Sequence, residues 1–292
     1  MAIHFTIIRN GNDYSAAPDG DQPFAVGRQV VYGNKTTSHT VGLANDGSSF
    51  AKRYLYTADA FRNAHPFWAD FIEPTAICEG QSFLTLNTYD RAFFTFGFAQ
   101  FSAHVPNGDF VLWLRDMLQL PDAPQYFPDL VFSNGQVCQL SDGVAMPLEG
   151  STSTQLLMTY LNPTLDAVED AEVLAAARLM HWTVQDPQTQ ELQVRHMVQV
   201  AKGHVSQADK RLGLDGKSAL LCLIIFDILH QGRGRYSDMQ HALLDPKPDA
   251  ALLQIGGVSE PGRCANLKKA LTPVRPAMLN SHTWNSARRD FT

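Results

Sequence analysis

Residues 78–100 decide the expected fold, and their sequence is CEGQSFLTLNTYDRAFFTFGFAQ. One carboxylate, Glu79, follows the apolar residue Ile77 and Cys78, and a second, Asp90, lies 11 residues later in a polar setting typical of a turn. The alternating residues 94–98 then predict a strand. The stretch therefore predicts a helix end, a turn and a short β-hairpin that hold two carboxylates.

Two carboxylates in unlike surroundings suit the cleavage of a glycosidic bond. One must keep its proton to donate it to the leaving oxygen, and an apolar setting favours the protonated form because it penalises the charge. The other must stay ionised to orient or activate water. We expect Glu79 to be the acid and Asp90 to act on the water. A separation of ~6.5–9.5 Å between the carboxyls would admit that water and invert the anomeric centre.

The order of these residues resembles the active-site stretch of phage-type lysozymes, in which Glu-Gly opens the segment and Tyr-Thr-x-Gly-x-Gly-His closes it. The resemblance implies that Glu79 is the acid, that Asp90 positions or activates the water, and that Thr95 holds that water. Here Ala99 and Gln100 stand where that family has Gly and His, and the interval from Glu to Asp is two residues longer. The matching residues are Glu79-Gly80, Tyr89-Asp90 and Phe94-Thr95-Phe96-Gly97.

Bacterial chitosanases of the same superfamily are similar over residues 90–97, where they have Asp-Gly-Arg-Gly-Tyr-Thr-x-Gly. The interval from Asp90 to Thr95 is the same in both. Residues 226–232 also resemble the buried helix of that family, which ends in Gln-His-Gly. Lytic transglycosylases and goose-type lysozymes share a weaker pattern, which is present as Glu79, Ser82-Phe83 and Gly97-Phe98-Ala99-Gln100.

The same stretch offers residues for binding a sugar. Tyr89 is a candidate for stacking on a sugar ring. Gly97 would let a ring approach the backbone closely, and Gln100 would hydrogen-bond either a sugar or the backbone. The phenylalanines at positions 93, 94, 96, 98 and 101 are expected in the core. Each catalytic candidate also has a structural alternative: a surface glutamate at a helix end, an aspartate that caps a turn, and a threonine that fills a strand.

The chain as a whole predicts an α+β fold that is mainly α. We expect a lysozyme-like domain over residues 57–292, with a small β-hairpin at the active site, and a β-rich N-terminal arm or subdomain over residues 1–56. Residues 217–231 are apolar nearly all the way round, which predicts a helix buried in the domain. Asp227 on this helix needs a partner, for which Arg233 and Arg235 are candidates.

Composition excludes several function classes. The net charge of −6 does not suit a non-specific nucleic-acid binder, which would usually be basic. We expect no metal or cofactor, because no metal-binding motif occurs and the histidines are scattered. The four cysteines lack paired spacing, so we expect buried free thiols. We expect no membrane span, since the strongest apolar run is far shorter than the ~20 residues that one needs.

These patterns predict a hydrolase that cleaves β-1,4 bonds in an aminosugar polymer. Peptidoglycan is the first candidate substrate, and chitosan or chitin is the alternative. A non-catalytic sugar-binding protein of the same fold is the alternative from another class. The N-terminal residues lack the pattern of a Sec signal. We therefore expect a soluble, bacteriolytic protein that is made in the cytoplasm and leaves by a specialised secretion system or by lysis, with an inhibitor or immunity protein as a further candidate partner.

Overall fold

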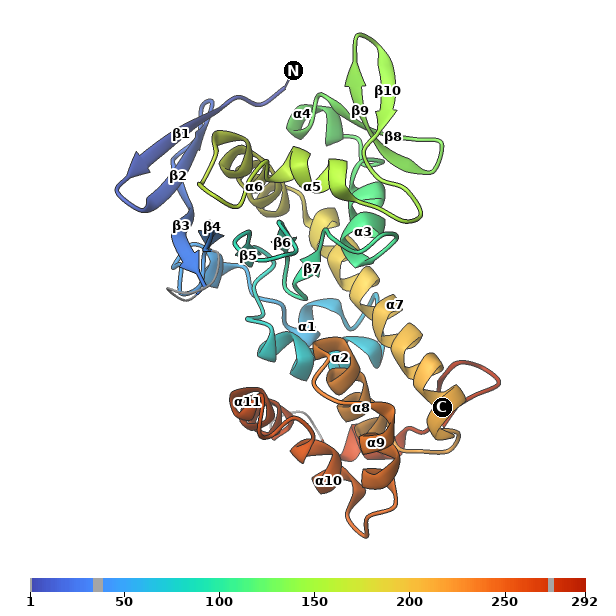
Figure 1. The fold of residues 1–292 in the computed structure, drawn as a ribbon. Coiled ribbons are helices and arrows are strands. Elements are labelled where there is room, and N and C mark those ends of the chain that lie inside the picture. The colour runs from blue at the N-terminus through green and yellow to red at the C-terminus, as the bar shows by residue number, and fades with distance from the viewer. Residues whose placement is uncertain (1, 34–38, 273–275) are drawn as a thin grey trace. The chain divides into compact units, whose positions relative to one another are not determined.

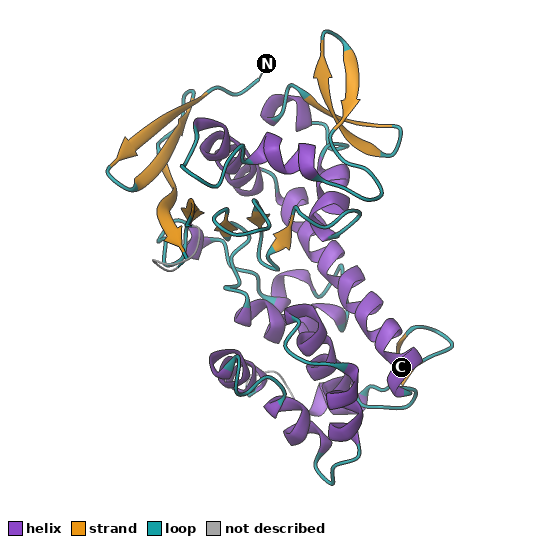
Figure 2. Ribbon diagram, in the orientation of Figure 1, coloured by secondary structure: helices purple, strands orange, loops and turns teal. Residues whose placement is uncertain are grey.

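The computed structural model describes residues 2–33, 39–272 and 276–292, and the chain forms two compact units (Figure 1). The first unit contains Met1–Tyr56 and Gly80–His196, and the second contains Thr57–Glu79 and Met197–Thr292. Helices outweigh strands, so the expected α+β, mainly α class is confirmed (Figure 2). The β-rich character expected for residues 1–56 is present, and these strands share a compact unit with residues 80–196.

A seven-stranded antiparallel sheet runs through the first unit, with its strands in chain order. The fourth and fifth strands meet through a single pair, Ala44 with Asn87, which joins the N-terminal strands to the segment that carries Asp90. Gly42 permits this approach, because a Cβ atom there would lie 2.7 Å from Thr88. The strands are β1 (Phe5–Asn10), β2 (Asp13–Pro18), β3 (Phe24–Tyr32), β4 (Thr40–Ala44), β5 (Leu86–Asn87), β6 (Thr95–Phe96) and β7 (Phe101–Ser102).

The aromatic residues that follow Asp90 form part of the core of this unit. Phe96 stacks on Trp113 with ring centroids 5.7 Å apart, and the phenylalanines at 94, 98 and 101 are also buried, as expected. Phe93 is only partly buried.

The other elements of the first unit are η1 (Ala51–Arg53), α3 (Asp109–Met117), α4 (Ala123–Tyr126), α5 (Gln155–Leu161), α6 (Asp170–Gln185), a sheet of β8 (Leu130–Ser133), β9 (Gln136–Ser141) and β10 (Val144–Pro147), and the start of α7 (Pro187–Leu212).

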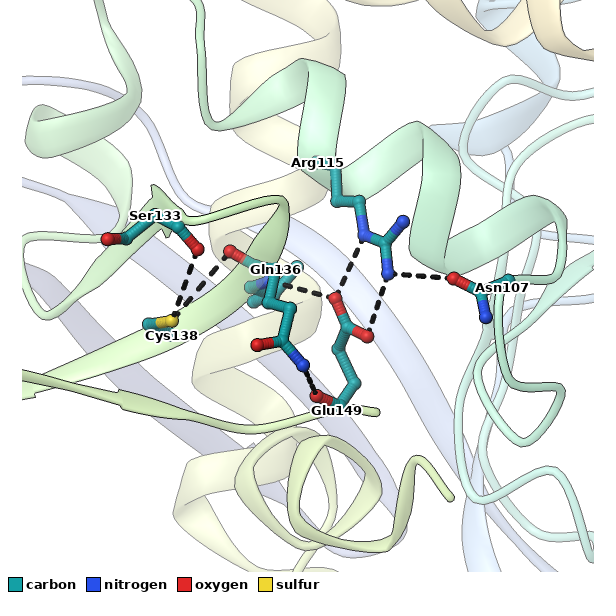
Figure 3. A network of polar contacts seen from close by, with 7 residues as sticks. Asn107, Arg115, Ser133, Gln136, Cys138 and Glu149 are labelled. Atoms are coloured by element: carbon teal, nitrogen blue, oxygen red, sulfur yellow. Dashed lines mark hydrogen bonds and ion pairs between the residues drawn. The ribbon is translucent and has the colours of Figure 1, made fainter. Parts of the chain in front are cut away.

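A buried ion pair fastens this three-stranded sheet to α3 (Figure 3). The Arg115 guanidinium donates to both carboxylate oxygens of Glu149, at 2.9 and 2.8 Å, and the backbone N–H of Val137 donates to the same carboxylate. Arg115 also reaches Asn107, and the Gln136 amide donates to the carbonyl of Glu149. Because the Glu149 side chain is fully buried, its charge depends on Arg115 for compensation.

The second unit is built around α8 (Ala219–Gln231), which is apolar and buried as its sequence predicts. Ser218 caps its start by accepting a hydrogen bond from Leu221, and Gly232 ends it in the left-handed conformation. Helix α2 (Trp68–Cys78) packs against α8 and α11 (Pro261–Leu271). The unit also holds α1 (Ala58–Phe61), α9 (Tyr236–Leu243), α10 (Pro248–Gln254), α12 (Pro276–Ser281), the rest of α7, and a pair of strands, β11 (Trp284–Asn285) and β12 (Asp290–Phe291).

The four cysteines are free thiols, as expected, although two of them are only partly buried. Within the described ranges, no helix combines the length and the apolar character needed to cross a lipid bilayer.

We predict that Arg115→Met lowers the free energy of unfolding by about 3 to 5 kcal/mol, because it leaves the Glu149 carboxylate buried without a cation. Urea unfolding measures the change. Arg28→Met is the matched control, since Arg28 pairs with Asp13 on an exposed surface and such pairs contribute little. Equal effects of the two substitutions would contradict the role given to the buried pair.

Candidate active site

Glu79 lies where α2 ends and the chain passes from the second unit to the first. Its backbone N–H closes the helix by donating to the carbonyls of Thr75 and Ala76. Gly80 follows with φ of +93°, a left-handed conformation that glycine adopts without strain and that turns the chain out of the helix. The helix end predicted from the sequence is therefore present at Glu79.

The carboxylate of Glu79 forms an ion pair with Arg263 of α11. The guanidinium Nη1 lies 2.6 Å from Oε1 of Glu79, and the two side chains are only 13% and 8% exposed. Glu79 is therefore not the exposed surface glutamate that the sequence left open as an alternative. The ion pair also corrects the apolar setting expected from Ile77 and Cys78, because the carboxyl group meets a guanidinium that the packing of α11 on α2 brings to it.

Asp227 holds Arg263 from the other side. The guanidinium donates to Asp227 at 2.6 Å and 3.4 Å, and the Thr75 hydroxyl donates to the same carboxylate at 3.0 Å. Arg233 is the second cation, with Nη2 at 3.1 Å from Oδ2 of Asp227, and both of these side chains are fully buried. The expected pairing of Asp227 with Arg233 is thus confirmed. The charge cluster of Glu79, Arg263, Asp227 and Arg233 carries two negative and two positive charges.

Burial and charge act against each other in the charge cluster. Burial lowers the pKa of Arg233, and the Asp227 carboxylate opposes that shift. For Arg263, burial alone would lower the pKa, but Asp227 and Glu79 raise it above its ordinary value. Burial raises the pKa of the neighbouring Cys78 thiol to about 11, so this thiol stays neutral. Arg263 therefore keeps its positive charge, and its contact with Oε1 fixes the direction of the Glu79 side chain.

Asp90 lies in the first unit, in the turn between β5 and β6. Its Oδ1 accepts a hydrogen bond of 2.8 Å from the N–H of Ala92, and its Oδ2 accepts one of 3.2 Å from the Asn87 amide. Asn87 also accepts from the N–H of Tyr89. Asp90 thus caps its own turn, as the structural alternative expected, while its half-exposed carboxylate is held in one orientation.

Thr95 is the strand partner of Asn87, so Asn87 adjoins both Asp90 and Thr95. The Thr95 side chain is buried, and its hydroxyl lies 3.4 Å from the hydroxyl of Ser102 on β7. The sequence reasoning missed Asn87, although a side-chain amide three residues before an aspartate is a signal for a turn. The role of Thr95 in holding a water stays a prediction.

Tyr89 forms an aromatic pair with Tyr32 of β3, with ring centroids 5.5 Å apart. Burial is the main cause that raises the pKa of Tyr89, and the charges of Asp46 and Asp90 raise it further. The phenol therefore stays protonated and can donate a hydrogen bond. Tyr32 is 60% exposed, so the pair presents an aromatic surface beside two carboxylates.

Gly97 and Gln100 lie in the turn between β6 and β7. Gly97 is buried with φ of +89°, and a Cβ atom there would lie 2.4 Å from the side-chain oxygen of Gln193 on α7. The close approach expected of a sugar is therefore made by Gln193, which also accepts a hydrogen bond from the N–H of Phe98. Gln100 adopts a left-handed conformation, and its backbone N–H donates to Gly97.

Neither a metal site in the described part of the chain nor a relative points to a function. Across the described residues, no group of three or more His, Cys, Asp or Glu side chains is arranged to hold a metal ion. No protein-family model, no curated protein and no solved structure gives a significant match to this chain.

We predict that Asp227→Asn lowers the free energy of unfolding by about 3 to 5 kcal/mol, because it leaves two buried guanidinium groups with too little negative charge. Urea unfolding measures the change, with Asp249→Asn as the control at an exposed position of α10 in the same unit. If both variants unfold at the same urea concentration, the charge cluster does not stabilise this unit.

Proposed function

We propose that this protein is a glycoside hydrolase that cleaves β-1,4 bonds in an aminosugar polymer, with Glu79 as the general acid and Asp90 as the residue that positions or activates water. The observation that carries the proposal is the charge cluster, in which the fully buried Asp227 pairs with Arg233 and also holds Arg263, the arginine that contacts Glu79. Buried charges are costly, so their convergence on a helix-end glutamate supports a functional role for it.

The cluster suits the step in which the sugar chain breaks. Glu79 is a carboxylate in its ion pair with Arg263, so the step begins when Glu79 takes up a proton from solvent. This proton then passes to the glycosidic oxygen while the bond between the anomeric carbon and that oxygen breaks, and Glu79 becomes a carboxylate again. Arg263 stabilises the charge that this step creates, because its guanidinium already lies against Oε1. The carboxylate of Glu79 then returns to its ion pair with Arg263. Arg263 and Asp227 act as positioning residues in this account.

Asp90 suits the complementary task. Its two oxygens each accept one hydrogen bond, from Ala92 and from Asn87, so the carboxylate is oriented and retains capacity to accept another from water. Water adds its oxygen to the anomeric carbon, and Asp90 accepts or directs the proton that the water loses. Thr95, the strand neighbour of Asn87, is the proposed second contact for that water.

The aromatic pair of Tyr32 and Tyr89 supports the binding of a sugar ring, since aromatic faces pack well on the apolar face of a sugar. Peptidoglycan is the first proposed substrate. The charges of Asp46 and Asp90 beside the Tyr89 hydroxyl favour the alternative, chitosan, because its free amino groups are cationic.

A peptidoglycan hydrolase would act outside the cytoplasm, after specialised export or lysis, and an inhibitor or immunity protein would protect the producing cell.

We predict that Glu79→Gln lowers kcat by about 10²- to 10⁴-fold and leaves the binding of oligosaccharides intact, because the amide cannot donate the proton. Reducing ends released from chitosan and the turbidity of purified cell walls measure turnover, and calorimetry measures binding. Glu260→Gln is the matched control at an exposed position of the same unit. A wild-type protein that binds sugars but cuts neither polymer at any pH from about 4 to 8 would be a sugar-binding protein instead.

We predict that Tyr32→Ala raises KM by several-fold to about tenfold with little change in kcat, because it removes half of the stacking surface and none of the groups proposed to transfer a proton. Steady-state kinetics on chitosan oligomers and on soluble peptidoglycan fragments measure the change. Tyr32→Phe keeps the ring and should retain the wild-type KM. An unchanged KM in Tyr32→Ala would remove this pair from the binding site.

A further inference from the structure

Three fully buried polar residues, Thr88, Asn162 and Glu172, lie behind the turn that carries Asp90 in the first unit. The proposed mechanism gives none of them a task. An apolar core would pack these positions at a lower cost in desolvation, so their hydrogen bonds indicate what they hold in place.

The Asn162 amide bridges the two ends of the Asp90 turn. Its Nδ2 donates to the carbonyl of Thr88 at 2.9 Å and to the carbonyl of Phe93 at 3.0 Å. These residues lie two positions before and three positions after Asp90. One side chain at the C-terminal end of α5 thus fixes the width of the turn.

Glu172 of α6 fixes the same turn through Thr88. The Thr88 hydroxyl donates to Oε1 of Glu172 and accepts a 2.6 Å hydrogen bond from the N–H of Leu43 on β4. The N–H of Leu43 also donates to Oε1 of Glu172 at 3.1 Å. Gly42, which brings β4 against Thr88, makes this arrangement sterically allowed. The start of the Asp90 turn is therefore linked to a buried carboxyl group.

The surroundings of Glu172 disfavour its charge. Burial raises its pKa to about 7, even though hydrogen bonds from Thr88 and from two backbone N–H groups act in the opposite direction, and the charge of Glu169 raises it further. Arg9 of β1, which packs against α6, is paired with Asp170. Within the described residues, Oε2 of Glu172 has no hydrogen-bond partner, so an ionised Glu172 would carry a poorly compensated buried charge.

We propose that Asn162 and Glu172 are positioning residues for Asp90, and that ionisation of Glu172 loosens the turn so that the site works best while Glu172 is protonated. The inference rests on the proposed function of Asp90. An ionised Glu172 draws water into the contact with Thr88 and displaces the start of the turn. The contribution of Glu172 to the free energy of unfolding is consequently fully present below its ordinary pKa of 4.5, and it is lost as pH rises to about 7, because in this range only the unfolded chain ionises readily.

Glu172→Gln tests the proposal, because glutamine mimics the protonated carboxyl and cannot ionise. Wild-type kcat is expected to fall up to about tenfold per pH unit above pH ~7, and Glu172→Gln is expected to move this alkaline limb upward by at least about one unit. Asn162→Ala should lower kcat across the whole pH range without moving the limb. An alkaline limb that is identical in wild type and Glu172→Gln overturns the pH role of Glu172.

Amide hydrogen exchange at residues 87–93 tests the same inference without any turnover. After correction for the intrinsic rate, protection in wild type should fall as pH passes about 7, while protection in Glu172→Gln should stay constant. Thr88→Val cuts the link to Glu172 and should also remove the pH dependence, which provides a second variant. Matching exchange in wild type and both variants overturns the link. The expected exchange together with an absence of hydrolysis would overturn the proposed function and leave the link to the turn intact.

Discussion

The fully buried carboxylate of Asp227 is the constraint on which the second unit depends. It lies on α8, where most neighbours are apolar, and an unpaired charge there would be strongly destabilising. Arg233, Arg263 and the Thr75 hydroxyl compensate it. Because Arg263 also binds Glu79, the requirement to neutralise one core charge determines where the proposed acid points.

The first unit holds its proposed catalytic residue by a different principle. Asp90 is oriented by its own turn, and the turn is held by the neutral donors of Thr88 and Asn162. Neutral hydrogen bonds cost less to bury than ions, and a neighbouring group that becomes charged without full compensation adds that cost to the buried network. Glu172 is that neighbour, so the position of the Asp90 turn is expected to depend on the ionisation of Glu172.

Local patterns predicted the parts of the structure that depend on nearby residues. The apolar run at 217–231 predicted the buried helix α8. Asp227 forms the expected ion pair with Arg233, which lies only six residues further along the chain. The contact between Glu79 and Arg263 spans 184 residues, and no local signal could reveal it. Gly97 shows the same limit: its glycine pattern suggested an open approach, but a side chain from distant α7 fills that space. The expected strand over residues 94–98 is also short, because only Thr95–Phe96 pairs.

Mass spectrometry of the products formed in ¹⁸O-labelled water tests the central claim most directly. Wild-type protein is incubated with purified peptidoglycan and, separately, with chitosan. A hydrolase that uses Glu79 and Asp90 as proposed introduces one ¹⁸O atom at each new reducing end, because the attacking water supplies that oxygen. Fragments without the label, or intact polymers in both reactions, would contradict the account.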